Sequence, residues 1–166
     1  MGGVVLGIAE VIMPAQRLAS LVAEEQEHGK KIVFTNGCFD LLHPGHVSYL
    51  AAARALGDLL IVGVNSDASV RRLKGEKRPI MPEAARAQLL AALASVDYVT
   101  LFGEDDPYQL ISLLKPDILV KGGDWNTASI VGRDLVEARG GKVYALPFVD
   151  AYSTTSIVEE ILRRYA

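Results

Sequence analysis

Short apolar runs alternate with amphipathic or alanine-rich segments along this chain of 166 residues. The runs are rich in β-branched residues, as is typical of strands that are buried on both faces of a parallel sheet. Between them, leucine, valine and alanine recur at helical spacing, and several of these segments end at glycine. The pattern predicts strands over residues 31–35, 59–64, 98–102, 117–121 and 142–146, and helices over 14–28, 47–56, 82–96, 107–114, 130–139 and 154–164.

Strands and helices alternate throughout, with short connections between them. This order predicts an α/β fold, a Rossmann-like, doubly wound sheet of five parallel strands with helices on both faces. We expect residues 65–79 to form a polar loop that is rich in cations, and residues 1–13 to be a frayed or docked extension. No internal repeat or linker interrupts the pattern, so a single domain over residues 1–166 is expected.

The connection after the first predicted strand carries the most distinctive residues. Residues 35–46 read Thr-Asn-Gly-Cys-Phe-Asp-Leu-Leu-His-Pro-Gly-His and include two of the three histidines, His43 and His46. Pro44 suits the first position of a helix, where no N–H is needed, and Gly45 lets a ligand approach the backbone closely. Both imidazoles are therefore expected at the start of a helix, where free N–H groups attract anions.

Three interpretations of the histidine pair follow from the residues alone. The imidazoles could cap the helix, bind a metal together with Asp40, or donate to phosphate oxygens as charge develops. Pro-Gly interrupts a regular helical turn between the two histidines, and no second cysteine is left to complete a zinc site. The buried strand and the polar turn before the pair favour phosphate chemistry.

Composition limits the classes of partner. The net charge is −3, so the basic footprint of a protein that binds nucleic acid is missing. Cys38 is the single cysteine, which excludes an internal disulfide and fits a reducing, cytoplasmic location. No apolar run approaches membrane-spanning length. The glycine motifs of dinucleotide-binding dehydrogenases and of P-loop ATPases are absent, which disfavours both classes.

The turn resembles the His-x-Gly-His signature of the nucleotidyltransferase superfamily that includes the small cytidylyltransferases. The similarity runs from about residue 15 onward and ends in Ser-Thr-Thr-Ser at residues 153–156, which resembles the second signature of the superfamily. Within the superfamily, the resemblance is strongest to the adenylyltransferase domains of ADP-heptose synthases. It covers residues 35–40, Asn-Ser-Asp at 65–67, Arg-Leu-Lys-Gly at 72–75, Arg-Pro at 78–79 and Val-Lys-Gly-Gly-Asp-Trp at 120–125.

The resemblance implies transfer of AMP from ATP to D-glycero-D-manno-heptose 1-phosphate, with Mg²⁺ carried by the ATP phosphates and no metal held by the protein alone. It implies catalytic roles for His43, His46 and Lys74, and contacts to a substrate phosphate from Arg78 and Arg86. The residues implied to bind the nucleotide are Asn36, Gly37, Cys38, Phe39, Asp40, Gly45, Gly122, Gly123, Asp124, Ser153, Thr154 and Thr155. Similar small enzymes suggest a homo-oligomer, a dimer or larger.

Several alternatives stay open at this point. A cytidylyltransferase that acts on glycerol 3-phosphate or ethanolamine phosphate is disfavoured, because Phe148 and Ala151 replace the arginine and glycine that precede the second signature in that branch. A nucleotide-binding module without catalysis and a metal-dependent hydrolase are the other classes. Arg86 fits an exposed helix position as well as a phosphate contact. Ser156 and Glu159 fit a capping box at the last helix.

Overall fold

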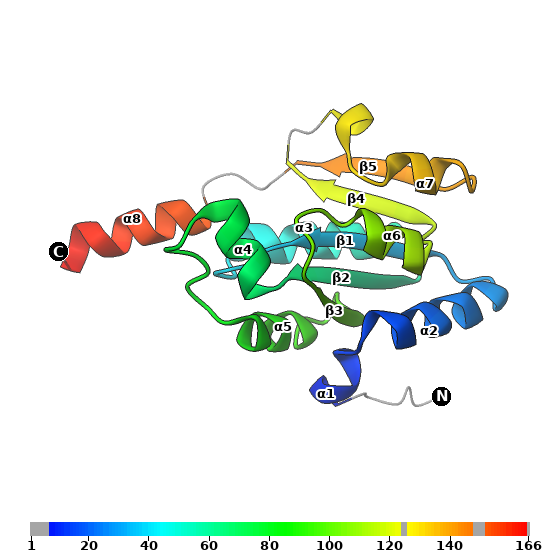
Figure 1. Cartoon of the computed structure of the whole chain (residues 1–166), viewed down its shortest axis with the longest axis horizontal. Coiled ribbons are helices and arrows are strands. Elements are labelled where there is room, and N and C mark those ends of the chain that lie inside the picture. Colours follow the sequence, from blue (N-terminus) through cyan, green and yellow to red (C-terminus); the bar gives the residue numbers. More distant parts are fainter. Residues whose placement is uncertain (1–6, 124–125, 148–151, 166) are drawn as a thin grey trace.

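The computed structural model describes residues 7–123, 126–147 and 152–165 and contains a sheet of five parallel strands (Figure 1). The strand order is β3-β2-β1-β4-β5, so the chain starts at the centre of the sheet and winds outward in both directions. The predicted Rossmann-like, doubly wound architecture is confirmed. The strands are β1 (Ile32–Gly37), β2 (Leu59–Asn65), β3 (Tyr98–Phe102), β4 (Ile118–Gly122) and β5 (Lys142–Leu146).

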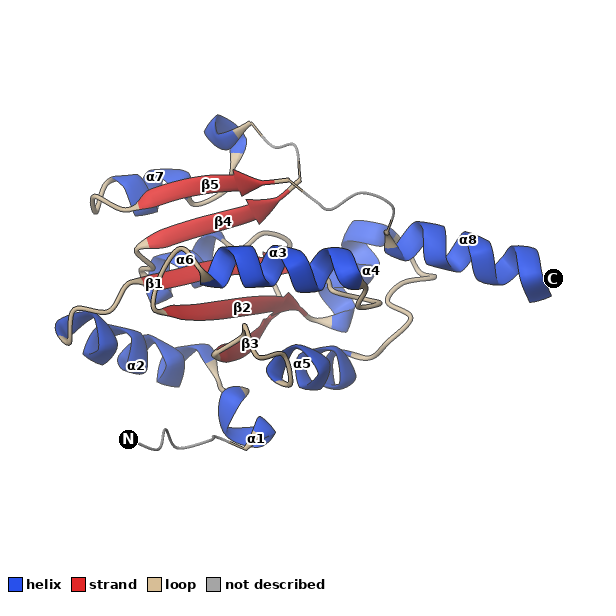
Figure 2. Ribbon diagram, turned by 180° about the vertical axis from the view of Figure 1, so that it is seen from behind, coloured by secondary structure: helices blue, strands red, loops and turns tan. Residues whose placement is uncertain are grey.

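Helices cover both faces of the sheet, as Figures 1 and 2 show from opposite sides. They are α1 (Ile8–Val11), α2 (Ala15–Glu27), α3 (Pro44–Arg54), α4 (Asp67–Lys74), α5 (Glu83–Ala91), α6 (Tyr108–Leu114), α7 (Arg133–Glu137) and α8 (Thr154–Tyr165), with the 3₁₀ turn η1 (Thr127–Ser129). Successive strand residues point to opposite faces, so Val33 packs with α3 and α5 while Ile32 and Phe34 pack with α2, α6 and α7. The continuous apolar runs are thereby buried on both sides.

The expected polar loop over residues 65–79 is wrong in its first half, where the chain forms α4. The hydroxyl of Ser66 caps this helix by accepting from the backbone N–H of Ser69 at 3.2 Å. Asp67 lies in the first turn and Lys74 in the last, where each charge complements the helix dipole. Val70 is its one large buried apolar residue, so the sequence carries almost no apolar periodicity to reveal the helix.

The N-terminal extension is docked over the residues that the structure describes. Val11 and Met13 are buried, and the backbone N–H of Met13 donates to the carbonyl of Val99 in the edge strand β3 at 3.0 Å. Two helices are shorter than predicted. α5 ends at Ala91 because residues 92–97 turn back to enter β3, and α7 spans only five residues because η1 precedes it. In the described part of the chain, none of the helices combines the length and the apolarity needed to cross a bilayer.

Candidate active site

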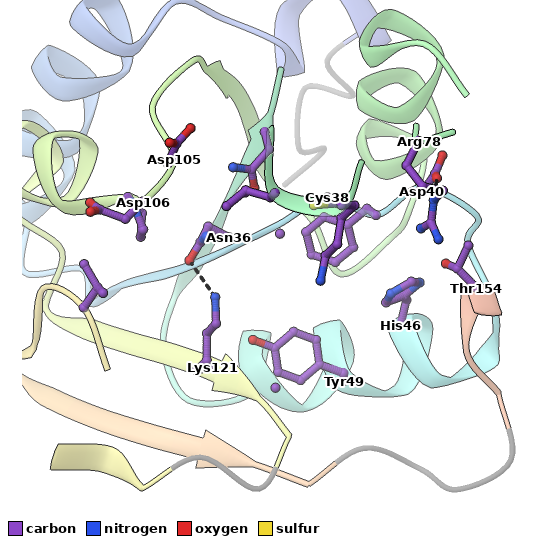
Figure 3. A pocket seen from close by; sticks show the side chains of 18 of the residues that line it. Asn36, Cys38, Asp40, His46, Tyr49, Arg78, Asp105, Asp106, Lys121 and Thr154 are labelled. Carbon is purple, nitrogen blue, oxygen red and sulfur yellow. Dashed lines mark hydrogen bonds and ion pairs between the residues drawn. The ribbon is translucent and has the colours of Figure 1, made fainter. Parts of the chain in front are cut away.

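A pocket of about 580 Å³ lies at the edge of the sheet where the strands end (Figure 3). Parallel strands end at a common edge, which is where open α/β folds bind ligands. Four expected contributors meet there, namely the turn after β1, the end of α4, the end of β4 and the start of α8. The loop after β3 and the segment after η1 also line the pocket and were not predicted from the sequence. The pocket is lined by Asn36, Gly37, Cys38, Phe39, Asp40, His46, Tyr49, Asn65, Leu73, Lys74, Arg78, Asp105, Asp106, Pro107, Lys121, Gly122, Ser129, Ile130, Val131, Thr154 and Thr155.

The two histidines of the turn form one stacked unit at the start of α3. His43 is the residue before the helix, Pro44 opens it, and the N–H of His46 donates to the carbonyl of His43 at 2.9 Å. Their ring centroids are 3.8 Å apart, and the planes differ by 24°. Phe39 meets the ring of His46 edge-on at 5.2 Å. His46 lines the pocket, whereas His43 is only 8% exposed and supports His46 from behind.

Burial favours the neutral form of both imidazoles. Loss of hydration and the neighbouring His43 together lower the pKa of His46 to about 4. A hydrogen bond with the backbone of Leu41 acts in the opposite direction and raises this pKa. Burial also lowers the pKa of His43 below its ordinary value. The Nδ1 atoms of both rings are buried without a hydrogen-bond partner in the described part of the chain. A phosphate bound beside His46 would favour the protonated imidazole and raise its pKa.

Asp40 ties the histidine turn to the segment that follows α4. Its carboxylate accepts the backbone N–H groups of Ile80 at 2.8 Å and Met81 at 2.9 Å, and it forms an ion pair with Arg78. Burial alone would raise the pKa of Asp40, but the two N–H groups and the guanidinium outweigh burial and lower it. Asp40 also lines the pocket, and its expected contact with the nucleotide stays a prediction. Arg78 lines the pocket beside it (Figure 3).

Arg86 is fully buried, which rules out the alternative of an exposed helix residue, while the expected contact with a substrate phosphate stays a prediction. Its guanidinium donates to the carbonyls of Cys38 at 2.6 Å and Met81 at 3.0 Å, and to the carboxylate of Asp67 at 2.8 Å. Arg86 is absent from the pocket lining. The side chain therefore joins α4, α5 and the turn after β1 from beneath the pocket.

Two lysines bring positive charge to the pocket. Lys74 is the last residue of α4 and is exposed. Lys121, which belongs to the motif at residues 120–125 but had no role predicted from the sequence, lies near the end of β4 and donates to the side chain of Asn36 at 3.4 Å (Figure 3). Burial lowers the pKa of Lys121. The nearby thiol of Cys38 raises this pKa, and the positive charge of Lys74 lowers it further. A lysine that directly follows a buried apolar run was the signal in the sequence that could have identified this position.

Thr154 and Thr155 open α8 and line the pocket, so the N-terminus of this helix adjoins the site. The helix is capped by Ser153, whose hydroxyl accepts the N–H of Ser156 at 2.9 Å while its own N–H donates to the hydroxyl of Ser156 at 3.0 Å. The prediction of a capping box between Ser156 and Glu159 is therefore wrong, because the helix is capped about one turn earlier in the chain, at Ser153. Ser153 itself is absent from the pocket lining.

The remaining candidates lie in or near the turn after β1 and the loop after β4. Cys38 is half-buried, and burial raises the pKa of its thiol, which makes it a poor nucleophile. Gly122 lines the pocket, whereas Gly45 and Gly123 do not. Gly123 has φ of 109°, a conformation that favours glycine. Asp124, which was expected to bind the nucleotide, and Trp125 lie outside the described residues.

Metal-ligating side chains do not cluster in the described part of the chain. Over residues 7–123, 126–147 and 152–165, no group of three or more histidine, cysteine, aspartate or glutamate residues could hold a metal ion. Asp105 and Asp106 reach the pocket, but Asp105 pairs with Arg72 and Asp106 accepts the N–H of Tyr108. The donor set thus fits a Mg²⁺ that is held mainly by phosphate oxygens and water.

Comparison with known proteins decides the family. The cytidylyltransferase-like family model matches residues 34–160, a span that contains the histidine pair, both lysines and the start of α8. The chain belongs to the cytidylyltransferase-like family of nucleotidyltransferases. Two relatives are the bifunctional protein HldE of Trichlorobacter lovleyi, 62% identical over 89% of this chain, and that of Geobacter metallireducens, 60% identical over 89%. The chain spans 30% of the length of each.

Solved structures agree with this family. The lipopolysaccharide core biosynthesis protein from Thermoplasma volcanium is 32% identical, with a TM-score of 0.61 over 75% of this chain and 100% of that one. The pantoate-beta-alanine ligase from Francisella tularensis, 19% identical, has a TM-score of 0.62 over 92% of this chain and 79% of that one. This second likeness concerns the fold alone.

Proposed function

We propose that this chain transfers AMP from ATP to D-glycero-D-manno-heptose 1-phosphate, giving ADP-heptose and pyrophosphate for glycans of the lipopolysaccharide type. One observation carries the proposal. The stacked pair of His43 and His46 opens α3 at the same pocket that Lys74, Lys121 and the N-terminus of α8 adjoin. This pocket combines imidazole donors, cations and the start of a helix, which suits a triphosphate. High identity to the HldE proteins supports the heptose substrate.

The reaction is an in-line displacement at phosphorus. A phosphate oxygen of the sugar 1-phosphate attacks the α-phosphorus of ATP, a new P–O bond forms, and the bond from that phosphorus to the bridging oxygen breaks to release pyrophosphate. No nucleophile from the protein is required, because the phosphate monoester already carries the attacking oxygen. The chain's residues contribute positioning and charge stabilisation.

Each part of the pocket has a role in this proposal. His46 donates to an oxygen of the reacting phosphate, and His43 holds its ring in place by stacking. Lys74 and the start of α8, at Thr154 and Thr155, neutralise the departing pyrophosphate. Lys121 and Arg78 contact the phosphate of the incoming sugar in this proposal.

Magnesium enters with the nucleotide in this proposal. Asp105 and Asp106 are the pocket carboxylates that could add a ligand to it or to its waters. When bound, the ion supplies charge neutralisation on the triphosphate. Because ATP and sugar phosphates are cytoplasmic metabolites, we place the reaction in the cytoplasm.

A substrate panel tests the proposal directly. Pyrophosphate release is measured with ATP or CTP, each with heptose 1-phosphate, glycerol 3-phosphate or ethanolamine phosphate as acceptor. We expect turnover with ATP and the heptose 1-phosphate. Preference for CTP with glycerol 3-phosphate or ethanolamine phosphate would instead establish the cytidylyltransferase alternative. Hydrolysis without an acceptor, together with a stoichiometric transition metal in the purified protein, would establish a metal-dependent hydrolase.

The histidine pair is tested by the variant His46→Ala. Loss of one donor to the transition state should lower turnover by about a hundredfold or more while ATP binding remains largely intact. His28→Ala is the matched control, since His28 is exposed at the end of α2 and far from the pocket lining. Unchanged turnover in His46→Ala would remove that histidine from the mechanism. A chain that binds ATP but releases no pyrophosphate with any acceptor would be a binding module.

A further inference from the structure

The backbone pairing between β1 and β4 stops short of the pocket. These two strands are neighbours at the centre of the sheet, where the winding of the chain reverses. In the described part of the chain, the register between them covers two pairs of residues and ends at Phe34 with Leu119. On their other sides, the pairing of β1 reaches Gly37 and that of β4 reaches Gly122. The ends of β1 and β4 are therefore unpaired with each other at the point where open α/β sheets bind their ligands.

The hydroxyl of Tyr49 joins the two strands directly beyond their last backbone pair. Tyr49 lies on α3, is 5% exposed and lines the pocket. Its hydroxyl donates to the carbonyl of Val120 in β4 at 3.3 Å and is hydrogen-bonded to the hydroxyl of Thr35 in β1. Because the phenol has one proton and gives it to Val120, the hydroxyl of Thr35 is the donor of the second bond. One side chain of α3 thus bridges both strands.

This bridge is buried and keeps its proton. Thr35 and Val120 are fully buried. Loss of hydration raises the pKa of Tyr49 to about 12, and the hydrogen bond with Thr35 acts in the opposite direction. The phenol therefore stays protonated at neutral pH and remains a donor to Val120. Removal of the hydroxyl takes one hydrogen-bond partner from each of these two buried groups, which is costly where water does not replace it.

The residues that directly follow the bridge lie at the pocket. Asn36 follows the bonded residue of β1, Lys121 follows that of β4, and the ammonium of Lys121 donates to the side chain of Asn36 at 3.4 Å. His46 lies three residues before Tyr49 on α3, so both side chains lie on the same side of the helix. The hydroxyl of Tyr49 points toward Lys121, and His46 lies farther along α3 (Figure 3). Tyr49 therefore connects the helix of the imidazole with the strand of the lysine.

We propose that Tyr49 is a positioning residue for nucleotidyl transfer, whose hydroxyl bridge fixes the ends of β1 and β4 relative to α3 and thereby holds Lys121 at a set distance from His46. The inference rests on the proposed function, in which His46 contacts the reacting phosphate and Lys121 the phosphate of the incoming sugar. These two contacts set the approach of the attacking oxygen to the α-phosphorus. A displacement of about 1 Å can slow such a step about a hundredfold. Tyr49 acts through Lys121 and does not touch the reacting atoms.

A double-mutant cycle tests this coupling. Tyr49→Phe deletes the hydroxyl, Lys121→Met deletes the charge, and a third protein carries both changes. Initial rates of pyrophosphate release are measured with ATP and the acceptor that gives turnover in the substrate panel. Tyr98→Phe is the matched control, because Tyr98 is a partly buried tyrosine at the start of β3, at the end of the sheet remote from the pocket. Thermal melts show that each variant is folded.

We expect Tyr49→Phe to lower kcat at least about tenfold while the KM for ATP changes less than about threefold. With Lys121→Met already present, loss of the hydroxyl should lower kcat less than about twofold, because the lysine that it positions is gone. Equal factors with and without Lys121 would overturn the proposal and make the hydroxyl a general stabilising group. A wild-type kcat in Tyr49→Phe would also overturn it.

A second measurement needs no activity and separates this inference from the proposed function. Titration of the lysine side chains, followed by carbon-13 NMR, reports the pKa of Lys121, which burial lowers and to which Cys38 and Lys74 also contribute. Both neighbours are unchanged in Tyr49→Phe, so a Lys121 that leaves its place and gains water should show a higher pKa than in the wild type. An unchanged pKa would overturn the positioning role even if the wild type transfers AMP. A wild type that transfers AMP to no acceptor would refute the proposed function, and the positioning role with it.

Discussion

Replacing Arg86 with lysine tests whether this side chain supports the pocket or contacts a phosphate. Lysine keeps the positive charge, but its single ammonium nitrogen cannot reach all three acceptors that the branched guanidinium holds at 2.6 to 3.0 Å. The three acceptors are the carbonyls of Cys38 and Met81 and the carboxylate of Asp67, and the substitution leaves two of the three without their donor. Because Arg86 is fully buried, water does not replace it.

The expected loss follows from these contacts. A hydrogen bond to a charged group contributes about 1.5–3 kcal/mol to the free energy of unfolding. Two are lost, but the side chain of Asp67 is 27% exposed and its share is screened by water. We therefore expect Arg86→Lys to be less stable by about 3 kcal/mol. For a chain of this length the loss corresponds to a fall of about 6–12 °C in melting temperature.

Urea denaturation followed by circular dichroism measures this loss, and isothermal titration calorimetry with ATP is the companion assay. Arg71→Lys is the control, because Arg71 is exposed on α4, and it should change stability by less than about 0.5 kcal/mol. At a temperature where both proteins are folded, ATP affinity should change much less than stability. An Arg86→Lys protein of wild-type stability that has lost ATP affinity would refute the reasoning and return Arg86 to direct phosphate binding.

Two further outcomes follow from ionised groups in the turn. Asp40→Asn should lower the free energy of unfolding at pH 7 by about 3 kcal/mol, because it leaves Arg78 and a backbone N–H without the carboxylate. Folding lowers the pKa of Asp40, so the difference in the free energy of unfolding between the two proteins should shrink in urea titrations below about pH 4. A difference that persisted below this pH would contradict the ion pair between Asp40 and Arg78. His46 has a folded pKa of about 4 against an ordinary 6.5, so the unfolded chain binds a proton first and stability falls as the pH drops through that interval. His46→Ala should weaken this fall in thermal melts at a series of pH values, and an identical slope in both proteins would exclude a buried neutral imidazole.

The strands and the histidine turn could be read from the sequence because their signals are local. A continuous apolar run marks a strand covered on both faces, and Pro44 after a polar turn marks the start of a helix. Parallel strands share one edge, so the convergence of Lys74, Gly122 and Thr154 on one pocket followed from the predicted topology. The strands and the helix start depend on residues that are neighbours in the sequence. The common edge follows because alternating strands and helices with short connections can form only a few topologies.

Two pairs of similar side chains, Arg78 with Arg86 and His46 with His43, each have one member at the pocket and one behind it. Only the tertiary structure decided which member faces the pocket. Arg86 and Arg78 are eight positions apart and chemically alike, yet the packing of α5 buries the first completely and leaves the second at the pocket. His46 likewise reaches the pocket while His43 stacks beneath it. The helix α4 escaped prediction because its capping hydroxyl and its charges, rather than an apolar stripe, stabilise it. The placement of Arg86 and Arg78 depends on contacts to residues far apart in the chain, Cys38 and Asp40, and no local pattern encodes it.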